Sequence, residues 1–317
     1  MRKRRMPNPS AFLVLTVATL LVGLPPVSAG ELPRIGITLH PYYSWVANIV
    51  GELALVVPVL PEDADPHTYQ PSPDDMESLQ TLDVIVMNGF GHDGFIEPML
   101  QAAGRNDLHR IRPMDGVPLL PAAGAGGDAA ATETSPQTRA YNSHAFLSVT
   151  SAAQQIFNIA AELGTLDAER SSQFQKNGRE YVRRLRWMQT RAMAEIGNLD
   201  LTDVRIATVH DGYSYLFRDV GLEVAAVIQP RHGVEPSPRQ LADTIKRLRD
   251  ARVDLLFTEL DFPRKVADLI REETGVRPFK LSHVSRGPYR AEKYEQEMAG
   301  NFQAVIAALR YLTERRR

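Results

Sequence analysis

The chain has 317 residues, of which 44% are hydrophobic and 23% charged, with no cysteine and a formal net charge of −2. Without cysteine there can be no disulfide framework and no thiolate metal site, so any bound metal would need His, Asp or Glu ligands. The acidic balance and the scarcity of basic patches argue against a nucleic-acid partner, and we expect a monomer.

The N-terminal residues 1–29 have the three parts of a secretory signal peptide. Residues 2–5 are all basic, 11–24 form an apolar stretch too short to span a membrane comfortably, and 27–29 form a small-residue cleavage site. No cysteine follows the apolar stretch, so no lipid anchor is expected there. We therefore predict export to the periplasm, with a mature chain that begins near Gly30.

Residues 30–165 alternate short apolar runs with helical patterns and are predicted to form an N-terminal metal-binding lobe. Strands are expected at 34–39, 54–60, 83–89 and 109–114, and helices at 41–53, from 73 to about 82, at 95–104 and at 151–164. Such alternation implies parallel strands with right-handed crossovers. Residues 117–140 interrupt the pattern, because they are rich in Ala, Gly, Ser and Thr without apolar periodicity. We expect a mobile loop there.

Residues 166–198 are predicted to form a linker helix, about 45 Å long, that runs across two lobes. Residues 199–317 then repeat the strand–helix alternation, which predicts a C-terminal metal-binding lobe. Its strands are expected at 205–209, 223–228, 254–260 and 278–282, with a helix that starts at Ser237-Pro238 and a last helix at 301–312. The predicted fold class is α/β, with two lobes that each contain a mostly parallel four-stranded sheet flanked by helices.

The segment DADPHTYQPSP, residues 63–73, places His67 in a loop between a strand and a helix. Its three prolines fix backbone angles and remove hydrogen-bond donors, so the loop holds its side chains in few orientations. Ser72 is the predicted N-cap of the next helix and Pro73 its first residue. This position is the usual ligand crevice of an open α/β sheet.

Most histidines of this chain share such a position. His40, His67, His92, His210 and His283 fall at or just beyond the carboxyl end of a predicted strand, His144 precedes a helix, His109 starts a strand and His232 lies in a loop. The carboxyl ends of parallel strands form one edge, so several of these imidazoles should meet in one crevice. Neutral imidazole is a common zinc ligand. The motifs of zincins, P-loop proteins, α/β-hydrolases and dinucleotide-binding folds are missing from the sequence.

Five segments carry a family resemblance: DPHTYQPSP (65–73), NGFGHDGFIEPML (88–100), HDGYSYLFRDVGL (210–222), GVEPSPRQL (233–241) and FTELDFPRKVADLIREETG (257–275). Together they resemble the zinc/manganese class of periplasmic solute-binding proteins of ABC transporters. The resemblance covers the whole predicted mature chain and implies two lobes joined by one long helix. It also implies a non-enzymatic carrier that hands a metal ion to a membrane permease.

The same resemblance implies a ligand set, residue by residue. The histidine of the DPH motif is His67, the histidine after the mobile loop is His144, and the third ligand, at the start of the second lobe, is His210. The family's fourth ligand is usually an aspartate after the last strand, but KLSHVSRGPY (280–289) contains no carboxylate. His283 is the nearest metal-binding side chain there.

The fourth position stays open between His283, water, Glu259 and Asp261. His40 and His92 are either hydrogen-bonding partners of the ligands, an accessory site or ordinary polar lining. Three or four histidines favour Zn²⁺ over Mn²⁺, which suits sites richer in carboxylate and water. The alternatives are a manganese-carrying homologue and a secreted zinc-dependent hydrolase with three histidines and an open fourth position.

Overall fold

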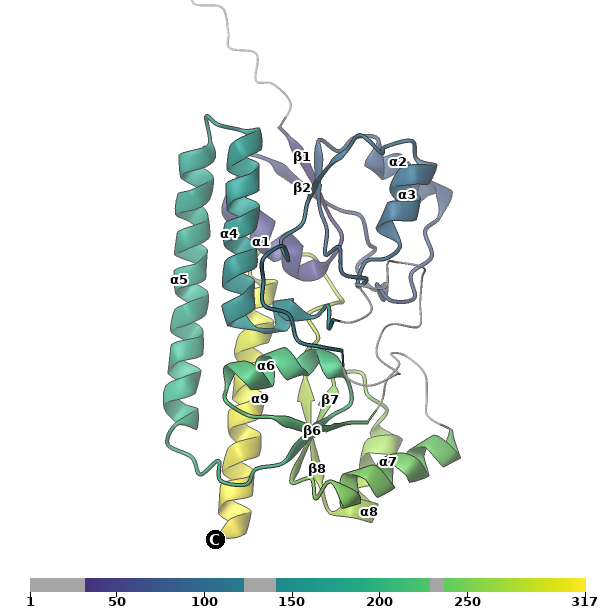
Figure 1. The fold of residues 1–317 in the computed structure, drawn as a ribbon, viewed down its shortest axis with the longest axis vertical. Helices are drawn as coiled ribbons and strands as arrows, with labels where there is room; N and C mark the ends of the chain where they lie inside the picture. The colour runs from purple at the N-terminus through teal and green to yellow at the C-terminus, as the bar shows by residue number, and fades with distance from the viewer. Residues whose placement is uncertain (1–31, 123–140, 229–236) are drawn as a thin grey trace, which may run out of the picture. The chain divides into compact units, whose positions relative to one another are not determined.

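The computed structural model describes residues 32–122, 141–228 and 237–317. The predicted signal peptide, most of the predicted mobile loop and His232 lie outside these residues. Within the part that is described, no helix is both long and apolar enough to cross a membrane. Residues Leu32–Arg317 belong to one compact unit, and Figure 1 shows their helices and strands.

The first sheet has four parallel strands in the order β2-β1-β3-β4. The elements of this lobe are β1 Arg34–Ile37, α1 His40–Val50, β2 Leu55–Pro58, α2 Pro73–Leu79, β3 Val84–Val86, α3 Ile96–Ala102, β4 His109–Ile111, the 3₁₀ turn η3 Ala145–Leu147 and α4 Val149–Leu166. Successive residues of a strand face opposite sides of a sheet. Val84 and Val86 therefore belong to the core shared with α1 and α4, whereas Ile85 packs in a separate cluster with α2 and α3.

The second sheet repeats this plan with the parallel order β6-β5-β7-β8. Its elements are β5 Ile206–Thr208, η4 Asp211–Tyr213, α6 Ser214–Asp219, β6 Val224–Val227, α7 Pro238–Asp250, β7 Leu255–Glu259, α8 Arg264–Thr274, β8 Arg277–Leu281 and α9 Lys293–Arg316. Two parallel four-stranded sheets flanked by helices confirm the predicted fold class.

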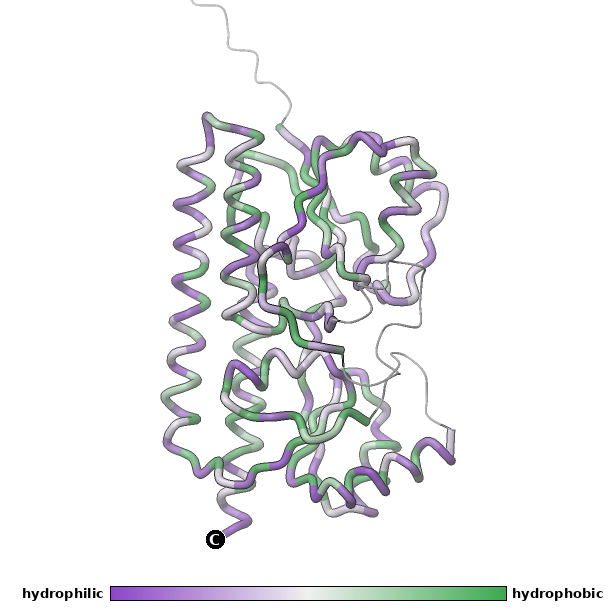
Figure 2. Tube along the Cα trace, in the orientation of Figure 1, coloured by the Kyte–Doolittle hydropathy of each residue, from purple (hydrophilic) through white to green (hydrophobic). Residues whose placement is uncertain are grey.

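The long helix α5, Ser171–Ile196, runs past both sheets (Figure 1). Its 26 residues give a length of about 39 Å. Most of its residues are hydrophilic (Figure 2), while Phe174, Tyr181 and Leu185 are buried in a core cluster that contains residues of both lobes. Near its start Asn177 donates to the carbonyl of Ile49 in α1, and near its end Gln189 donates to Asp219 in α6. It therefore braces both halves of the molecule.

The predicted helix starts after the two Pro-containing loops are confirmed. Ser72 caps α2, because its hydroxyl accepts from the amide of Asp75 while the Asp75 carboxylate accepts from the amide of Ser72. Ser237 and Gln240 form the same capping box at α7. Such reciprocal bonds satisfy amides that would otherwise lack partners, so they fix where each preceding loop ends.

Two predictions of local structure were wrong. The last helix begins at Lys293, eight residues before the predicted start at Asn301, and the six-residue α6 was not predicted. A helix this short gives too few positions for a periodic pattern. The early start of α9 shortens the segment 282–292, which connects β8 to α9 and also contacts the first lobe: Tyr289 donates to the carbonyl of Leu60 and Ser44 to that of Arg290.

Candidate metal centre

Five imidazole rings of the described residues meet where the carboxyl ends of the two sheets face each other. His144 lies in the middle, with ring-centroid distances of 4.5 Å to His92, 4.5 Å to His210, 5.0 Å to His283 and 5.4 Å to His67. Two imidazoles bound to one zinc ion at about 2.0–2.1 Å have centroids about 5 Å apart. The rings therefore already lie at the spacing that a shared ion requires.

Among the residues that the structure describes, two groups of ligand atoms are close enough to hold a metal ion. One group consists of His67, His144 and His210, and the other of His210, Glu259 and His283; within each, the ligand atoms lie within 4.8 Å of one another. The first group joins two residues of the first lobe to one of the second. The four histidines of the predicted ligand set thus lie together, and Glu259, an alternative for the fourth position, lies beside two of them.

Asn142 orients the His144 ring. Its side-chain oxygen Oδ1 lies 2.8 Å from Nδ1 of His144 and also accepts from the backbone amide of His144, while its Nδ2 donates to the carbonyl of Asp211. An amide oxygen can only accept, so Nδ1 carries the hydrogen and Nε2 keeps the free electron pair for a metal. Asn142 was not among the predicted site residues, although an Asn two residues before a candidate ligand is a typical local side-chain-to-backbone acceptor.

Burial keeps His144 neutral. The ring is 1% exposed. Its removal from water, together with the surrounding histidines His92, His210, His283 and His67, lowers the pKa of His144 well below its ordinary value. A neutral imidazole is the form that binds metal, so this ring needs no deprotonation at neutral pH.

Gly212 allows the His144 and His210 rings to approach each other. A Cβ atom at this position would lie 2.9 Å from Cγ and Cδ2 of His144 and 2.9 Å from Nδ1 of His210. The Gly212 amide donates to Nδ1 of His210 over 3.1 Å, so Nδ1 is the unprotonated ring nitrogen in this state. An ion bound through Nε2 would move the hydrogen to Nδ1 and break this contact. No local sequence pattern indicated this role of Gly212, because it depends on how closely two rings from different lobes approach each other.

His67 is held by the loop in which it was predicted to lie. Its backbone amide donates to Oδ1 of Asp65 over 3.0 Å, and Oδ2 of the same carboxylate pairs with Arg286 at 3.2 Å. Arg286 also pairs with Asp261, at 3.0 Å, in the loop after β7. This guanidinium therefore links the loop that carries His67 to the second lobe.

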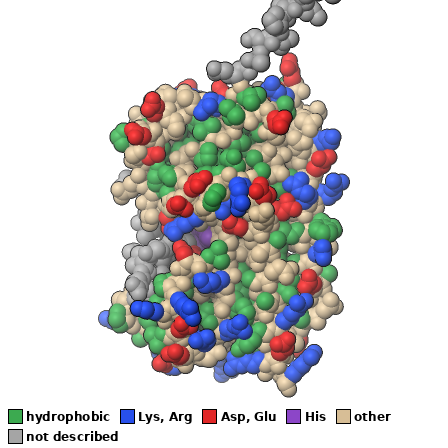
Figure 3. All heavy atoms as spheres, turned by 180° about the vertical axis from the view of Figure 1, so that it is seen from behind, with side chains coloured by type: hydrophobic (Ala, Val, Ile, Leu, Met, Phe, Trp, Pro, Cys, Tyr) green, Lys and Arg blue, Asp and Glu red, His purple; other side chains and the backbone are tan. Residues whose placement is uncertain are grey.

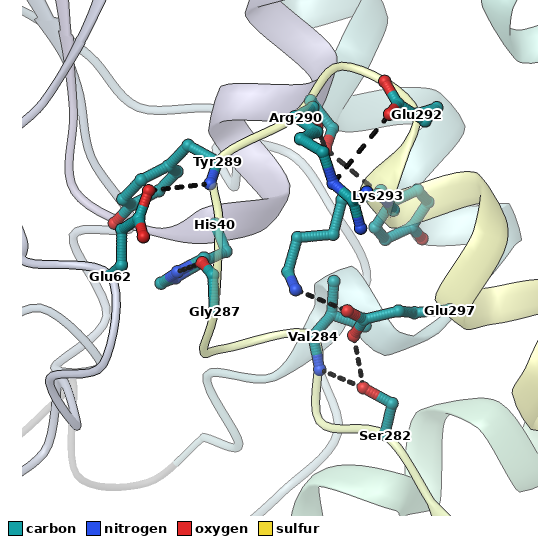
Figure 4. A network of polar contacts seen from close by, with 12 residues as sticks. His40, Glu62, Ser282, Val284, Gly287, Tyr289, Arg290, Glu292, Lys293 and Glu297 are labelled. Atoms are coloured by element: carbon teal, nitrogen blue, oxygen red, sulfur yellow. Dashed lines mark hydrogen bonds and ion pairs between the residues drawn. The ribbon is translucent and has the colours of Figure 1, made fainter.

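His283 is fixed by an unusual backbone. The next residue, Val284, is buried at φ +58°, a left-handed conformation that is a genuine outlier for a β-branched residue. The Val284 amide donates to the Ser282 hydroxyl, the Ser282 hydroxyl bonds Glu297, and Glu297 pairs with the buried Lys293 at 2.5 Å (Figure 4). Such strain persists only where the surroundings over-determine it, so these contacts fix the direction of the His283 side chain.

His92 also lies in the cluster, 4.3 Å from the His67 ring. Its Nδ1 is 3.3 Å from the hydroxyl of Ser143. The neighbouring Asp93 is buried and accepts from the hydroxyl of Thr38 and the amide of Asn88, both over 2.6 Å. Burial raises the pKa of the Asp93 carboxyl above its usual value, although these hydrogen bonds oppose the rise. This turn holds His92 against both His67 and His144.

His40 and His109 lie elsewhere. His40 Nε2 is 3.0 Å from the carbonyl of Gly287, and its ring stacks on Tyr289 at 4.1 Å (Figure 4). Burial lowers the pKa of His40 to about 4. His109 is half exposed and lies 3.4 Å from Glu162. His40 therefore packs between α1 and the segment 282–292, where it contacts Gly287 and Tyr289 rather than the histidine cluster.

The cluster has limited access to solvent. Figure 3, which shows the molecule from behind relative to Figure 1, shows histidine atoms in a hollow between the upper and lower parts of this face. His144 and His92 are each 1% exposed, while His283 is 9% exposed. The rings therefore form a nearly enclosed, nitrogen-rich site.

The sequence matches the family described as "ZnuA: Zinc-uptake complex component A periplasmic" over residues 35–308. The chain belongs to this family. Its members are substrate-binding proteins of metal ABC transporters and not enzymes, which confirms the family resemblance and decides against the hydrolase alternative. The protein is thus a metal-binding substrate-binding protein that works with a membrane permease, in a family found in the periplasm or outside the cell.

Individual relatives differ in the metal that they are named for. The solved structure of the substrate-binding protein FpvC from Pseudomonas aeruginosa in complex with Mn²⁺ is 43% identical, with a TM-score of 0.80, and the match covers 89% of this chain and 99% of that one. FpvC has also been solved with Ni²⁺. The high-affinity zinc uptake protein ZnuA of Bacillus subtilis is 22% identical over 79% of this chain and 78% of its own length. The family alone therefore leaves the cargo metal open.

Proposed function

We propose that this protein binds Zn²⁺ in the periplasm and delivers it to the permease of an ABC importer, and that His67, His144, His210 and His283 hold the ion. The gathering of imidazole rings around His144, at spacings of 4.5–5.4 Å, carries this proposal. Nitrogen donors in a tetrahedral arrangement suit zinc. The ion is cargo, so a site closed by protein serves the function better than one with a water ready to react.

The choice of zinc over manganese follows from the donor atoms. Mn²⁺ prefers carboxylate, carbonyl and water oxygens, and it is the weakest binder in the ordinary series of divalent first-row metals. A site whose described ligand groups comprise four imidazoles and the Glu259 carboxylate should therefore bind Zn²⁺ and Ni²⁺ more tightly than Mn²⁺. The Mn²⁺ and Ni²⁺ complexes of FpvC make both ions necessary competitors in any test.

Metal analysis of protein purified from the periplasm with its native ion retained would test the cargo. We expect about one zinc per chain, and a stoichiometric content of manganese would contradict the proposal. Analysis of the N-terminus of the same sample would test cleavage near Gly30, since a chain that still carries residues 1–29 would contradict export through a cleaved signal.

Substitution of single ligands would test the site. His67→Ala, His144→Ala and His210→Ala should each weaken zinc binding by orders of magnitude, because each removes a bond to the ion. His109→Ala is the matched control, since this half-exposed histidine lies on β4 away from the cluster. Calorimetry that finds wild-type zinc affinity in both His67→Ala and His210→Ala would refute the assignment.

A further inference from the structure

We propose that the second lobe carries a metal position of its own, formed by His210, Glu259 and His283, which a divalent transition-metal ion occupies in alternation with the four-histidine position at His67, His144, His210 and His283. This rests on the proposed metal-carrying function and adds a ligand and a step to it. The donor set, two imidazoles and one carboxylate, is an established one for zinc. The ligand atoms of this group lie within 4.8 Å of one another.

The register of the second sheet explains why these three residues meet. Thr208 of β5 pairs with Phe257 of β7, so His210 and Glu259, each two residues further along, extend side by side from neighbouring strands. Glu259 pairs in turn with Leu281 of β8, and His283 follows two residues later. Residues two apart on a strand point to the same side, so the sheet edge itself brings the three side chains together.

All three ligands belong to one lobe, whereas the other group needs both. The distances among His210, Glu259 and His283 depend on the pairing of β5, β7 and β8 and on the contacts of Ser282 with α9, all within the second lobe. His67 and His144 come from the first lobe and are placed by other loops, including the contact of Asn142 with the carbonyl of Asp211. The second lobe can therefore retain an ion when the contacts of the first lobe are lost.

Charge also favours an ion next to Glu259. Four neutral imidazoles leave both positive charges of a divalent ion uncompensated in a nearly enclosed site, which is costly. The Glu259 carboxylate supplies one negative charge at ligand distance of His210 and His283. His210 and His283 belong to both positions, so an ion can move between them without releasing these two ligands. The two positions share these two rings, so a single ion occupies them in turn.

We infer that the position on the second lobe holds the ion while it is being captured or released. An ion held there has lost the ligands of the first lobe but is still bound, which is the state expected immediately before transfer to a permease. Glu259 should then matter little when all four histidines are available and much more when His67 is missing.

A double-mutant cycle of His67→Ala and Glu259→Gln, followed by zinc affinity in chelator competition, tests this. We expect Glu259→Gln to weaken zinc binding less than about threefold in the otherwise unchanged chain and at least about tenfold in the His67→Ala background. His67 is a partly exposed loop residue, so its loss should leave the fold intact. Glu272→Gln, an exposed carboxylate on α8 of the same lobe, is the matched control and should have no effect in either background.

Two outcomes would overturn the inference. An equally large loss in both backgrounds would make Glu259 a permanent ligand of a single site, and an equally small loss would give it no part in binding. A different result would contradict the proposed function itself, namely unchanged zinc affinity in the His67→Ala single variant.

Discussion

The hydrogen bond from His144 to Asn142 predicts that zinc affinity depends on Asn142, a residue that need not touch the metal. In Asn142→Ala the acceptor 2.8 Å from Nδ1 of His144 is lost. Nothing then holds the hydrogen on Nδ1, and the tautomer that places it on Nε2 blocks metal binding. Loss of such an orienting partner typically costs 10–100-fold in metal affinity, or about 1.4–2.7 kcal/mol.

The same substitution also affects folding, so the two effects need separate measurements. Asn142 makes three buried or half-buried hydrogen bonds through its side chain, each worth about 1 kcal/mol net. Zinc affinity should be measured by chelator competition at a temperature where circular dichroism shows the variant folded. Asn158→Ala is the matched control, because Asn158 bonds two backbone carbonyls, those of Pro113 and Asp115, away from the histidines.

Asn142→Asp separates control of the His144 tautomer from the bond between the lobes. Aspartate keeps an acceptor for the His144 ring but cannot donate to the carbonyl of Asp211. We therefore expect a smaller loss of zinc affinity for Asn142→Asp than for Asn142→Ala. Wild-type affinity in Asn142→Ala would refute the reasoning, and equal losses in the two variants would show that the bond to Asp211 matters and the tautomer does not.

Three further changes test other parts of the site. Gly212→Ala should weaken zinc binding more than about tenfold, because the added Cβ lies 2.9 Å from both His144 and His210. Gly300→Ala is the control, since there is open space around Gly300 and zinc affinity should stay unchanged. Equal zinc affinities of the two variants in titrations would contradict this prediction. Arg286→Ala should speed zinc release, measured by stopped-flow chelation, by about two- to tenfold, because it removes the link between Asp65 and Asp261. The free energy of unfolding should fall by at most about 1 kcal/mol for each exposed ion pair lost. An unchanged release rate would show that this link does not hold the site closed. The pKa of His40 is lowered to about 4 in the folded protein, so as the pH falls this imidazole binds a proton in the unfolded chain before it does so in the folded one. The free energy of unfolding should therefore decrease by about 3 kcal/mol as the pH falls from about 6.5 to 4. In urea unfolding of the apo protein, His40→Gln should remove this loss of stability between pH 7 and pH 4. The control His109→Gln, at an exposed histidine, should not remove it. Identical pH dependence of the two variants would contradict the prediction.

The sequence alone predicted the order of the strands and of most helices, together with the residue types near the site. Ser72-Pro73 and Ser237-Pro238 predicted two helix starts, because capping depends only on residues within one turn. The apolar runs predicted all eight strands, and the positions of His67, His210 and His283 after strands predicted one crevice.

Only the tertiary structure showed which side chains face one another. Asn142 and Gly212 contact His144 and His210 through loops whose positions depend on how the two sheets pack against α5 and α9, and no local pattern encodes that. His92 joined the cluster because the turn anchored by Asp93 directs it toward His67. The placement of Glu259 beside His210 and His283 depends on strand register, which is fixed by hydrogen bonds between residues about 20 to 50 positions apart in the chain. Short-range chemistry therefore specifies the elements and candidate ligands, while long-range pairing and packing decide which of them can share an ion.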